Sequence, residues 1–302
     1  MIPQLKALAV QNGYKLEVVA ANKIELMRQD IKKLSKEAPY NETLKNRIYN
    51  SAAIKKIPKD VISIIILAAP CDFAYINFIF NRKGKQHKFF GLAGNRLNEA
   101  VDFVKNTVTL AGYNISVAQK LPLKRLAVQS GLAVYGKNNI TSVEGMGSFL
   151  LYEAFYTNIP CDADNWRDVA VSPLCDGCNI CLESCATGAI AKDRFIIDRD
   201  ICMRKINNKP EDFPDWLPIT AHHTLYGCIK CQGSCPINAE LDTLDVVFTE
   251  EESEIIFSGA SWKNASEELK DKLAFFGTMN KIKKRNLRNL LELMDKGYVP
   301  GL

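Results

Sequence analysis

Eight of the ten cysteines in this 302-residue chain lie between residues 166 and 245, and their spacing constrains the fold more than any other feature. The first run, CDGCNICLESC at 175–185, has the pattern C-x2-C-x2-C-x3-C. The second run, CIKCQGSCP at 228–236, lacks one cysteine, which Cys202 can supply from upstream. Such spacing lets three thiolates wrap one iron–sulfur cubane, while the fourth cysteine of the run serves a different cluster.

The pattern therefore predicts two [4Fe–4S] clusters that exchange ligands between the runs. One cluster would be bound by Cys175, Cys178, Cys181 and Cys235, and the other by Cys185, Cys202, Cys228 and Cys231. Structural zinc and disulfides are the alternatives. Zinc sites usually combine two C-x2-C pairs, and reduced cytosolic thiols disfavour disulfides. Ala186 follows Cys185 where proline is usual, but this change removes no ligand.

The remaining cysteines and the histidines show no ligand spacing. Cys71 and Cys161 stand alone, and we expect each to be a small buried apolar residue. We expect His87, His222 and His223 on the surface or behind the cluster ligands. The predicted metal site is therefore confined to the eight clustered cysteines.

The composition favours a globular cytoplasmic protein. At 47% hydrophobic residues, the chain can bury a sizeable core. The apolar run at 61–70 is too short to span a bilayer and predicts a buried strand, and no signal-peptide pattern precedes it. We therefore expect a cytoplasmic location and no membrane contact. The net charge of +5 permits a nucleic-acid partner without requiring one.

Helical and strand patterns alternate up to about residue 165, which indicates an α/β domain. Helices are predicted at 22–37, 95–112 and 121–131, and strands at 14–20 and 61–70. The composition then changes, because residues 166–245 hold the eight clustered cysteines and leave little room for a separate apolar core. The chain should therefore divide into segments 1–165, 166–245 and 246–302, the last of them helical.

Three stretches together resemble epoxyqueuosine reductases, which are relatives of the reductive dehalogenases. They are LPLKRLAVQSGLAVYGKNNI at 121–140, GMGSFLLYEAFYTNIP at 145–160 and the eight-cysteine module. The resemblance implies a nitroreductase-like corrinoid-binding domain, a ferredoxin-like double-cluster domain and C-terminal helices. It also implies cobalamin, which the clusters would reduce and which would drive a two-electron reduction of the substrate. By position, the residues near the corrinoid would be Gly136, Lys137, Asn138, Gly147 and Ser148.

From the residues alone, the loop at 136–138 suits a corrinoid or a flavin phosphate, or is a tight turn that needs glycine. The chain also departs from the family at one position. Epoxyqueuosine reductases carry an aspartate proton donor where this chain has Val117, and valine transfers no proton. Tyr113 and Tyr135 are nearby residues that could donate instead.

The C-terminal stretch NKIKKRNLRNLLELMDKG carries a cluster of basic residues, namely Lys281, Lys283, Lys284, Arg285 and Arg288. These residues could contact the phosphates of a transfer RNA, or they could form a solvated face. A reductase of this type would also need a low-potential electron donor such as ferredoxin or flavodoxin. Two other functions stay open: an electron-transfer protein that reduces a partner such as a corrinoid protein, and a flavin-dependent reductase.

Overall fold

The computed structural model describes residues 1–36, 40–54, 56–71, 75–91, 97–193, 195–209, 211–224, 227–238, 243–258, 265–274 and 284–298. The chain forms two compact units. The first comprises residues 1–71, 95–178 and 192–196, and the second comprises residues 72–94, 179–191 and 197–302. These units do not coincide with the predicted segments 1–165, 166–245 and 246–302, because residues 72–94 group with the C-terminal part of the chain.

The first unit is built on a four-stranded antiparallel sheet with the order β1-β2-β8-β5. Its strands are β1 (Lys15–Ala20), β2 (Ser63–Pro70), β5 (Ile115–Val117) and β8 (Leu150–Thr157). Its helices are α1 (Ile2–Gln11), α2 (Lys23–Leu34), α3 (Glu42–Ser51), α4 (Leu97–Leu110) and α5 (Leu123–Gln129). A short hairpin adds β6 (Val134–Tyr135) and β7 (Thr141–Ser142).

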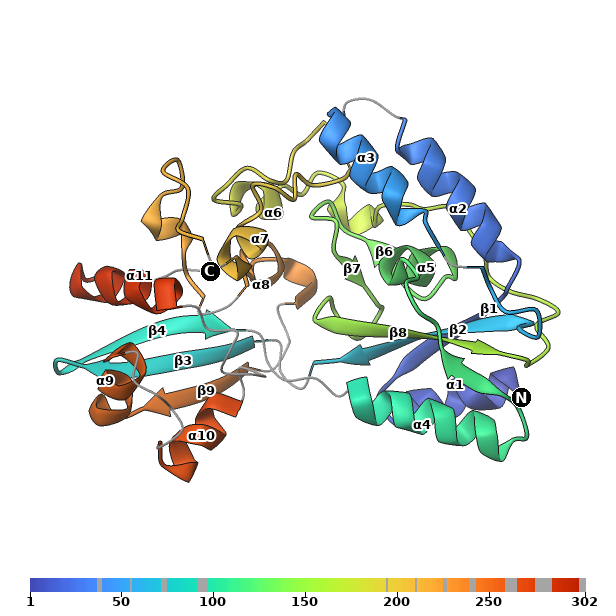
Figure 1. Ribbon diagram of the computed structural model, residues 1–302, viewed down its shortest axis with the longest axis horizontal. Coiled ribbons are helices and arrows are strands. Elements are labelled where there is room, and N and C mark those ends of the chain that lie inside the picture. Colours follow the sequence, from blue (N-terminus) through green and yellow to red (C-terminus); the bar gives the residue numbers. More distant parts are fainter. Residues whose placement is uncertain are drawn as a thin grey trace. The chain divides into compact units, whose positions relative to one another are not determined.

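Strand β2 explains the long apolar run in the sequence. Its residues alternate between two cores, with Ile64 and Ile66 on one side and Ile65 and Leu67 on the other. Helices α2, α3 and α5 cover the first face, and α1 and α4 cover the second (Figure 1). A strand buried on both faces needs apolar residues at every position. The buried strand and the α/β class predicted from the sequence are therefore confirmed.

The second unit contains a three-stranded sheet that joins distant parts of the chain. It has the order β4-β3-β9, from strands β3 (Tyr75–Arg82), β4 (Lys85–Gly91) and β9 (Thr243–Phe248). β3 and β4 form a hairpin whose turn residues Lys83 and Gly84 both have positive φ, as a two-residue turn requires. β9 pairs with β3 in parallel, and the rings of Phe80 and Phe248 stack with centroids 4.8 Å apart.

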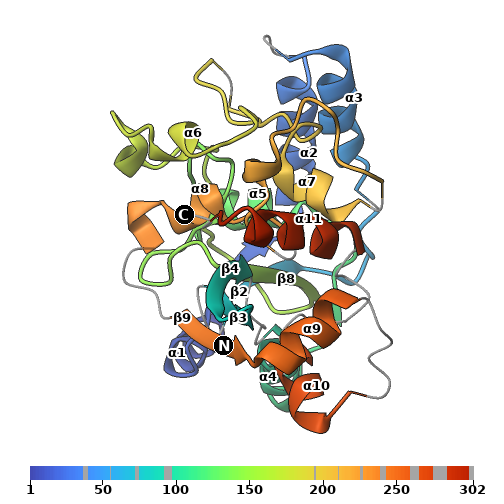
Figure 2. The same cartoon turned by 90° about the vertical axis from the view of Figure 1, so that its left-hand side faces the viewer.

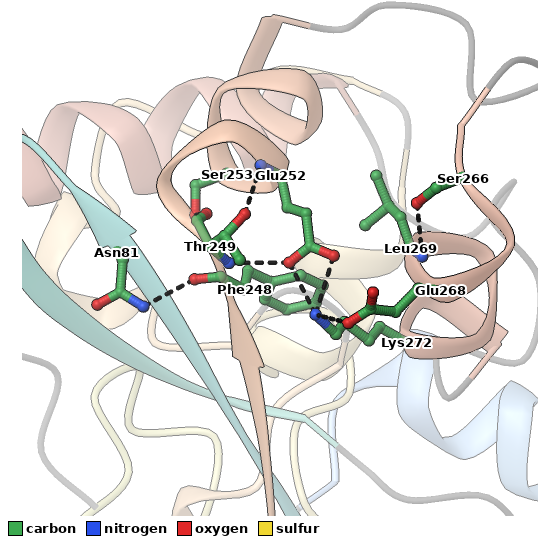
Figure 3. A network of polar contacts seen from close by, with 9 residues as sticks. All are labelled: Asn81, Phe248, Thr249, Glu252, Ser253, Ser266, Glu268, Leu269 and Lys272. Carbon is green, nitrogen blue, oxygen red and sulfur yellow. Dashed lines mark hydrogen bonds and ion pairs between the residues drawn. The ribbon is translucent and has the colours of Figure 1, made fainter.

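Three helices lie beside this sheet (Figure 2). They are α9 (Glu250–Ser258), α10 (Glu267–Ala274) and α11 (Lys284–Asp295). Helix α9 begins with a capping box, in which the Glu252 amide donates to the Thr249 hydroxyl and the Thr249 amide donates to the Glu252 carboxylate (Figure 3). Lys272 of α10 donates to both oxygens of that carboxylate, so one side chain joins two helices.

The cysteine-bearing part of the second unit has short elements and a small apolar core. The elements are α6 (Ile180–Glu183), α7 (Met203–Asn208), η2 (Ile219–Ala221), α8 (Lys230–Gly233) and η3 (Pro236–Asn238), while η1 (Pro173–Cys175) belongs to the first unit. One apolar cluster here consists of Met203, Ile206, Leu217 and Ala221 with their neighbours. None of the described helices is both long and apolar enough to cross a membrane.

Candidate metal centre

Helices α6 and α8 form matching halves of the cysteine module. Each is a four-residue helix that begins two residues after a cysteine, Cys178 before α6 and Cys228 before α8. Each helix also contains a cysteine, Cys181 in α6 and Cys231 in α8. The two helices pack together, and the Ser234 hydroxyl donates to the Ser184 hydroxyl at 3.1 Å. Each serine directly precedes the last cysteine of its run, so this contact joins equivalent points of the two runs.

Five thiols of the second unit lie close enough for their charges to interact. Burial, together with smaller contributions from the charges of Cys202 and Cys185, raises the pKa of Cys228 to about 12. Burial also raises the pKa of Cys231, with further contributions from the charges of Cys228, Cys202, Cys185 and Cys181. Cys185, Cys202, Cys228 and Cys231 are the set predicted for one cluster, and Cys181, predicted for the other cluster, lies near them. Desolvated thiolates that repel one another are stabilised by bound cations, so this donor set fits an iron–sulfur cluster.

Helix α7 links Cys202 to the segment that carries Cys228. Cys202 is the N-terminal capping residue of α7, and Asn207 lies in its last turn. The Asn207 side chain is fully buried and donates to the carbonyl oxygen of Gly227 at 2.8 Å. Gly227 directly precedes Cys228, and its carbonyl also accepts from the Thr224 hydroxyl at 2.8 Å. The upstream cysteine is therefore held in a fixed relation to the second run.

His222 and His223 are buried, and His223 lies behind a predicted ligand. Their exposed fractions are 0% and 1%, so neither is a surface residue. Nε2 of His223 lies 3.8 Å from Sγ of Cys228 and accepts from the Ile229 amide at 3.4 Å. The sequence allowed a position behind the ligands for these histidines but did not single out His223. Its place five residues before Cys228 is the one signal that the sequence offers.

The first cysteine loop, from Cys175 to Cys178, belongs to the first unit. Ser172 caps η1, since its hydroxyl accepts from the Leu174 amide at 3.3 Å. The Cys178 amide donates to the Cys175 carbonyl at 3.2 Å, and Gly177 between them has φ of +71°. The turn thus uses a conformation that favours glycine. The predicted set of Cys175, Cys178, Cys181 and Cys235 is divided between the two units and stays a prediction.

The loop predicted to lie near a corrinoid is a compact turn. Oδ1 of Asn138 accepts from the Ile140 amide at 3.0 Å, and the Gly136 amide donates to the Ile140 carbonyl at 2.7 Å. A Cβ atom on Gly136 would lie 2.8 Å from Oδ1 of Asn138, so a larger residue here would displace the Asn138 side chain. The Lys137 side chain leaves the turn and donates to the Cys178 carbonyl at 2.8 Å.

The other predicted corrinoid residues lie in a second turn. Gly147 has φ of +67°, and its carbonyl accepts from the Val143 amide at 3.0 Å. Ser148 follows it and is buried. Both predicted turns lie in the first unit, next to strands β6 and β7. Their role toward a corrinoid stays a prediction.

Val117, at the position predicted to correspond to the proton donor of the family, ends the short strand β5. It pairs with Phe155 and is 37% exposed. Of the two tyrosines considered as replacements, Tyr135 is buried, and burial raises its pKa above the ordinary value. Its ring meets Phe195 edge-on, with centroids 5.0 Å apart. Tyr113 packs beside the core formed by α1 and α4.

The basic cluster at the C-terminus falls largely outside the described residues. Lys281 and Lys283 are not described, and the structure gives only the backbone of Lys284 and Arg285. Arg288 is exposed on α11 and pairs with Asp212 at 2.8 Å. The predicted contact with RNA phosphates therefore stays a prediction.

The two isolated cysteines are half-buried, where the sequence led us to expect buried residues. Cys71 continues from β2, and its amide donates to the Phe149 carbonyl at 2.9 Å. The Cys161 thiol faces the carbonyl oxygens of Val18 and Ala163. Burial raises the pKa of this thiol, and the charges of Asp164 and Asp162 add to the effect. Cys161 therefore stays protonated, as a packing residue would.

Two further observations concern alternative sites. Among the described residues, no three His, Cys, Asp or Glu side chains are arranged to hold a single metal ion. The thiolates of a four-iron cluster each bind a different iron atom, so they stand farther apart than the ligands of one ion. A cavity of about 340 Å³ lies in the first unit, between Asp30, Arg125, Asp168 and Phe195. Its lining includes none of the residues predicted for the corrinoid.

Residues 174–238 match the family described as "4Fe-4S double cluster binding domain". The match includes all eight clustered cysteines, from Cys175 to Cys235. This part of the chain is therefore a double-cluster domain that binds two [4Fe–4S] clusters, as its spacing predicts.

The chain is also similar to epoxyqueuosine reductases. It is 28% identical over 119 residues to the Bacillus subtilis enzyme, and the match covers 39% of this chain and 30% of that protein. The matched regions span less than half the length of the curated relatives.

Two solved structures share the fold. A selenomethionine-labelled epoxyqueuosine reductase matches with a TM-score of 0.62 at 19% identity, over 96% of this chain and 80% of that one. An epoxyqueuosine reductase bound to a tyrosine tRNA stem loop modified with epoxyqueuosine matches with a TM-score of 0.61 at 19% identity. This match covers 96% of this chain and 82% of that one. The resemblance predicted from the sequence is therefore confirmed.

Proposed function

Since the chain is epoxyqueuosine reductase-like in both sequence and fold, we propose that it is an iron–sulfur, cobalamin-dependent reductase. In this function the cysteines of the double-cluster domain would hold two clusters that supply electrons one at a time, and a corrinoid bound by the first unit would supply the reducing chemistry. The observation that carries the proposal is the convergence of Cys185, Cys202, Cys228 and Cys231 in a double-cluster domain. Such a domain transfers electrons but performs no bond chemistry, so the first unit must supply the site of reduction.

The eight cysteines divide between the clusters as the spacing indicates. One cluster is bound by Cys185, Cys202, Cys228 and Cys231, which lie close enough for their charges to interact, although Cys181 of the other set also affects Cys231. The other is bound by Cys175, Cys178, Cys181 and Cys235, which are the remaining cysteines of the two runs. With crossed ligands the clusters lie close together, which allows electrons to pass between them.

The corrinoid is held by the two turns of the first unit, through Gly136, Lys137, Asn138, Gly147 and Ser148. Backbone amides, an ammonium group and a hydroxyl suit the amide side chains and phosphate of a corrinoid. Because Oδ1 of Asn138 accepts from the Ile140 amide, this residue shapes the turn. The bound corrinoid would supply low-valent cobalt chemistry, and the chain would position it and exclude water.

The proton for the reaction comes from a group other than the aspartate of the family. Val117 occupies that position and has no proton to give. Burial raises the pKa of Tyr135, which makes its hydroxyl a weaker acid, so its role would depend on direct contact with substrate. A different proton donor is consistent with a substrate that differs from that of the family. We propose a modified tRNA base of the epoxyqueuosine type as the first substrate to test.

The partners follow from this function. The electron donor is a low-potential carrier such as ferredoxin or flavodoxin, and the reaction takes place in the cytoplasm, where cluster cysteines stay reduced. A tRNA stem loop would contact basic side chains such as Arg288 through its phosphates. A partner corrinoid protein would replace the tRNA if the chain acts only as an electron carrier.

The direct test uses anaerobic protein loaded with iron, sulfide and cobalamin, a chemical reductant and a stem loop that carries epoxyqueuosine. Mass spectrometry follows the loss of the epoxide oxygen. Reduction that depends on both the clusters and cobalamin supports the proposal. Cluster-loaded protein that reduces a separate corrinoid protein, but neither retains cobalamin nor converts the stem loop, would favour the electron carrier.

A further inference from the structure

Lys137 connects two functional segments of the first unit. Its Nζ atom donates to the carbonyl oxygen of Cys178 at 2.8 Å, across 41 residues of sequence. Lys137 belongs to the compact turn at 136–140, whereas Cys178 ends the first cysteine loop. The contact is therefore tertiary, and it brings a positive charge to the backbone of a predicted cluster ligand.

A second contact holds the same two segments together. The Ser172 amide donates to the Tyr135 carbonyl at 2.7 Å, and Tyr135 forms a parallel bridge with Val171. The Ser172 carbonyl in turn accepts from the Cys175 amide at 2.9 Å. The cysteine loop is thus anchored at its start by Ser172 and at its end by Lys137.

The charge of Lys137 is not neutralised by a described neighbour. Among the residues that the structure describes, no carboxylate lies within ion-pair distance of its Nζ atom. Its side chain is half-buried, so water screens the ammonium less than it would on an open surface. The ammonium group is therefore held at the backbone of the cysteine loop, 2.8 Å from the Cys178 carbonyl oxygen.

We propose that Lys137 is a positioning residue that holds the Cys175–Cys178 loop and raises the reduction potential of the cluster bound there. Reduction adds one electron and makes the cluster more negative. A fixed positive charge stabilises that reduced form more than the oxidised form. Charge and hydrogen bonding around a cluster are among the factors that set its potential. This inference rests on the proposed function, because it requires that the cysteines bind clusters.

The test measures the reduction potentials of both clusters in the full chain, assembled anaerobically, by redox titration followed by electron paramagnetic resonance. Lys137→Met removes the charge and the hydrogen bond, and Lys137→Arg keeps the charge. Lys124→Met is the matched control, because Nζ of Lys124 donates at 2.8 Å to the Asn139 carbonyl of the same turn.

We expect Lys137→Met to lower the potential of one cluster and leave the other unchanged. Lys137→Arg should shift it less, and Lys124→Met should shift neither. If Lys137→Met does not assemble the cluster, Lys137→Gln takes its place in the titration. Unshifted potentials in a neutral variant that retains both clusters would overturn the inference but leave the proposed function intact. A native chain without clusters would contradict both.

Discussion

Sγ of Cys228 lies 3.8 Å from Nε2 of His223, whose Nδ1 lies 3.0 Å from the carbonyl oxygen of Ala221. Because a carbonyl oxygen only accepts, Nδ1 carries the proton and Nε2 is the acceptor for the Ile229 amide. Burial lowers the pKa of His223 to about 4, so the ring is neutral at physiological pH. A neutral, fully enclosed imidazole thus supports the segment that carries a cluster ligand.

This arrangement predicts how stability changes with pH. The folded-state pKa of about 4 lies below the ordinary histidine pKa of 6.5, so the unfolded chain takes up the proton first as the pH falls. The free energy of unfolding should therefore fall between pH 6.5 and pH 4, by about 3 kcal/mol, and His223 should add no further loss below that range.

Chemical denaturation of native protein and His223→Gln isolates this contribution, because glutamine does not titrate. The difference in unfolding free energy between the two proteins should change across the same interval. His87→Gln is the control variant, because His87 is a half-exposed histidine on the β3–β4 hairpin. It shows the effect of replacing a histidine that is not buried. A native-minus-variant difference that stays constant from pH 7 to pH 4 would show that His223 does not titrate as a buried neutral ring.

Cys202→Ala should remove one cluster and leave the other assembled. Cys202 caps α7 and lies among the thiols that affect Cys228 and Cys231, so its loss leaves that cluster with three ligands. The iron content should fall from about eight to about four atoms per chain. Iron analysis and absorption spectra measure this, with Cys161→Ala as a control that should keep all the iron. Two intact clusters in Cys202→Ala would show that the ligand partition is wrong.

Glu252→Ala should destabilise the second unit. It removes the carboxylate of the α9 capping box and a partner of Lys272 (Figure 3). Burial lowers the pKa of Lys272, but its hydrogen bonds with Glu252 and Glu268 outweigh this effect and raise the pKa. We expect a loss of about 2 kcal/mol in the free energy of unfolding.

Glu251→Ala is the matched control, since Glu251 is exposed in the first turn of the same helix and should change stability by less than about 0.5 kcal/mol. Thermal and chemical denaturation compare the three proteins. Equal losses in the two variants would mean that the network around Glu252 adds nothing beyond a general preference for acidic residues at the start of a helix.

Val117→Asp should increase the rate of epoxyqueuosine reduction, because it restores a carboxyl group at the donor position. The side chain is 37% exposed at the end of a short strand, so the substitution should cost little stability. Val117→Asn has nearly the same shape but transfers no proton. Single-turnover assays on the modified stem loop should therefore separate the two variants. Equal rates would indicate that the substrate or the proton donor differs from that of the family.

Local patterns in the sequence predicted much of the fold. The apolar run at 61–70 became β2, and the helical pattern at 95–112 became α4. The sheet of the second unit was not predicted, because β3 and β9 pair across about half of the chain. Asn77 and Asp245, which share a hydrogen bond in this sheet, are 168 residues apart. Such a pairing depends on tertiary packing and leaves no local period to detect.

In the candidate site too, the sequence predicted some residues and missed others. Cysteine spacing predicted the double-cluster domain because the ligands themselves are the signal. The supporting residues carry no such signal: Asn207 and Lys137 are ordinary polar residues until the fold brings them to Gly227 and Cys178. The serine before the last cysteine of each run, Ser184 and Ser234, is a repeat that the sequence contains and that marks the contact between α6 and α8.

The central claim, that this chain combines two clusters with a corrinoid, is tested most directly by metal analysis. Protein purified without oxygen is incubated with cobalamin, freed of unbound ligand, and measured for iron, cobalt and its absorption spectrum. We predict about eight iron atoms and one tightly bound cobalt atom per chain, in agreement with two four-iron clusters. A full complement of iron with no retained cobalt, or with a flavin spectrum, would contradict the account.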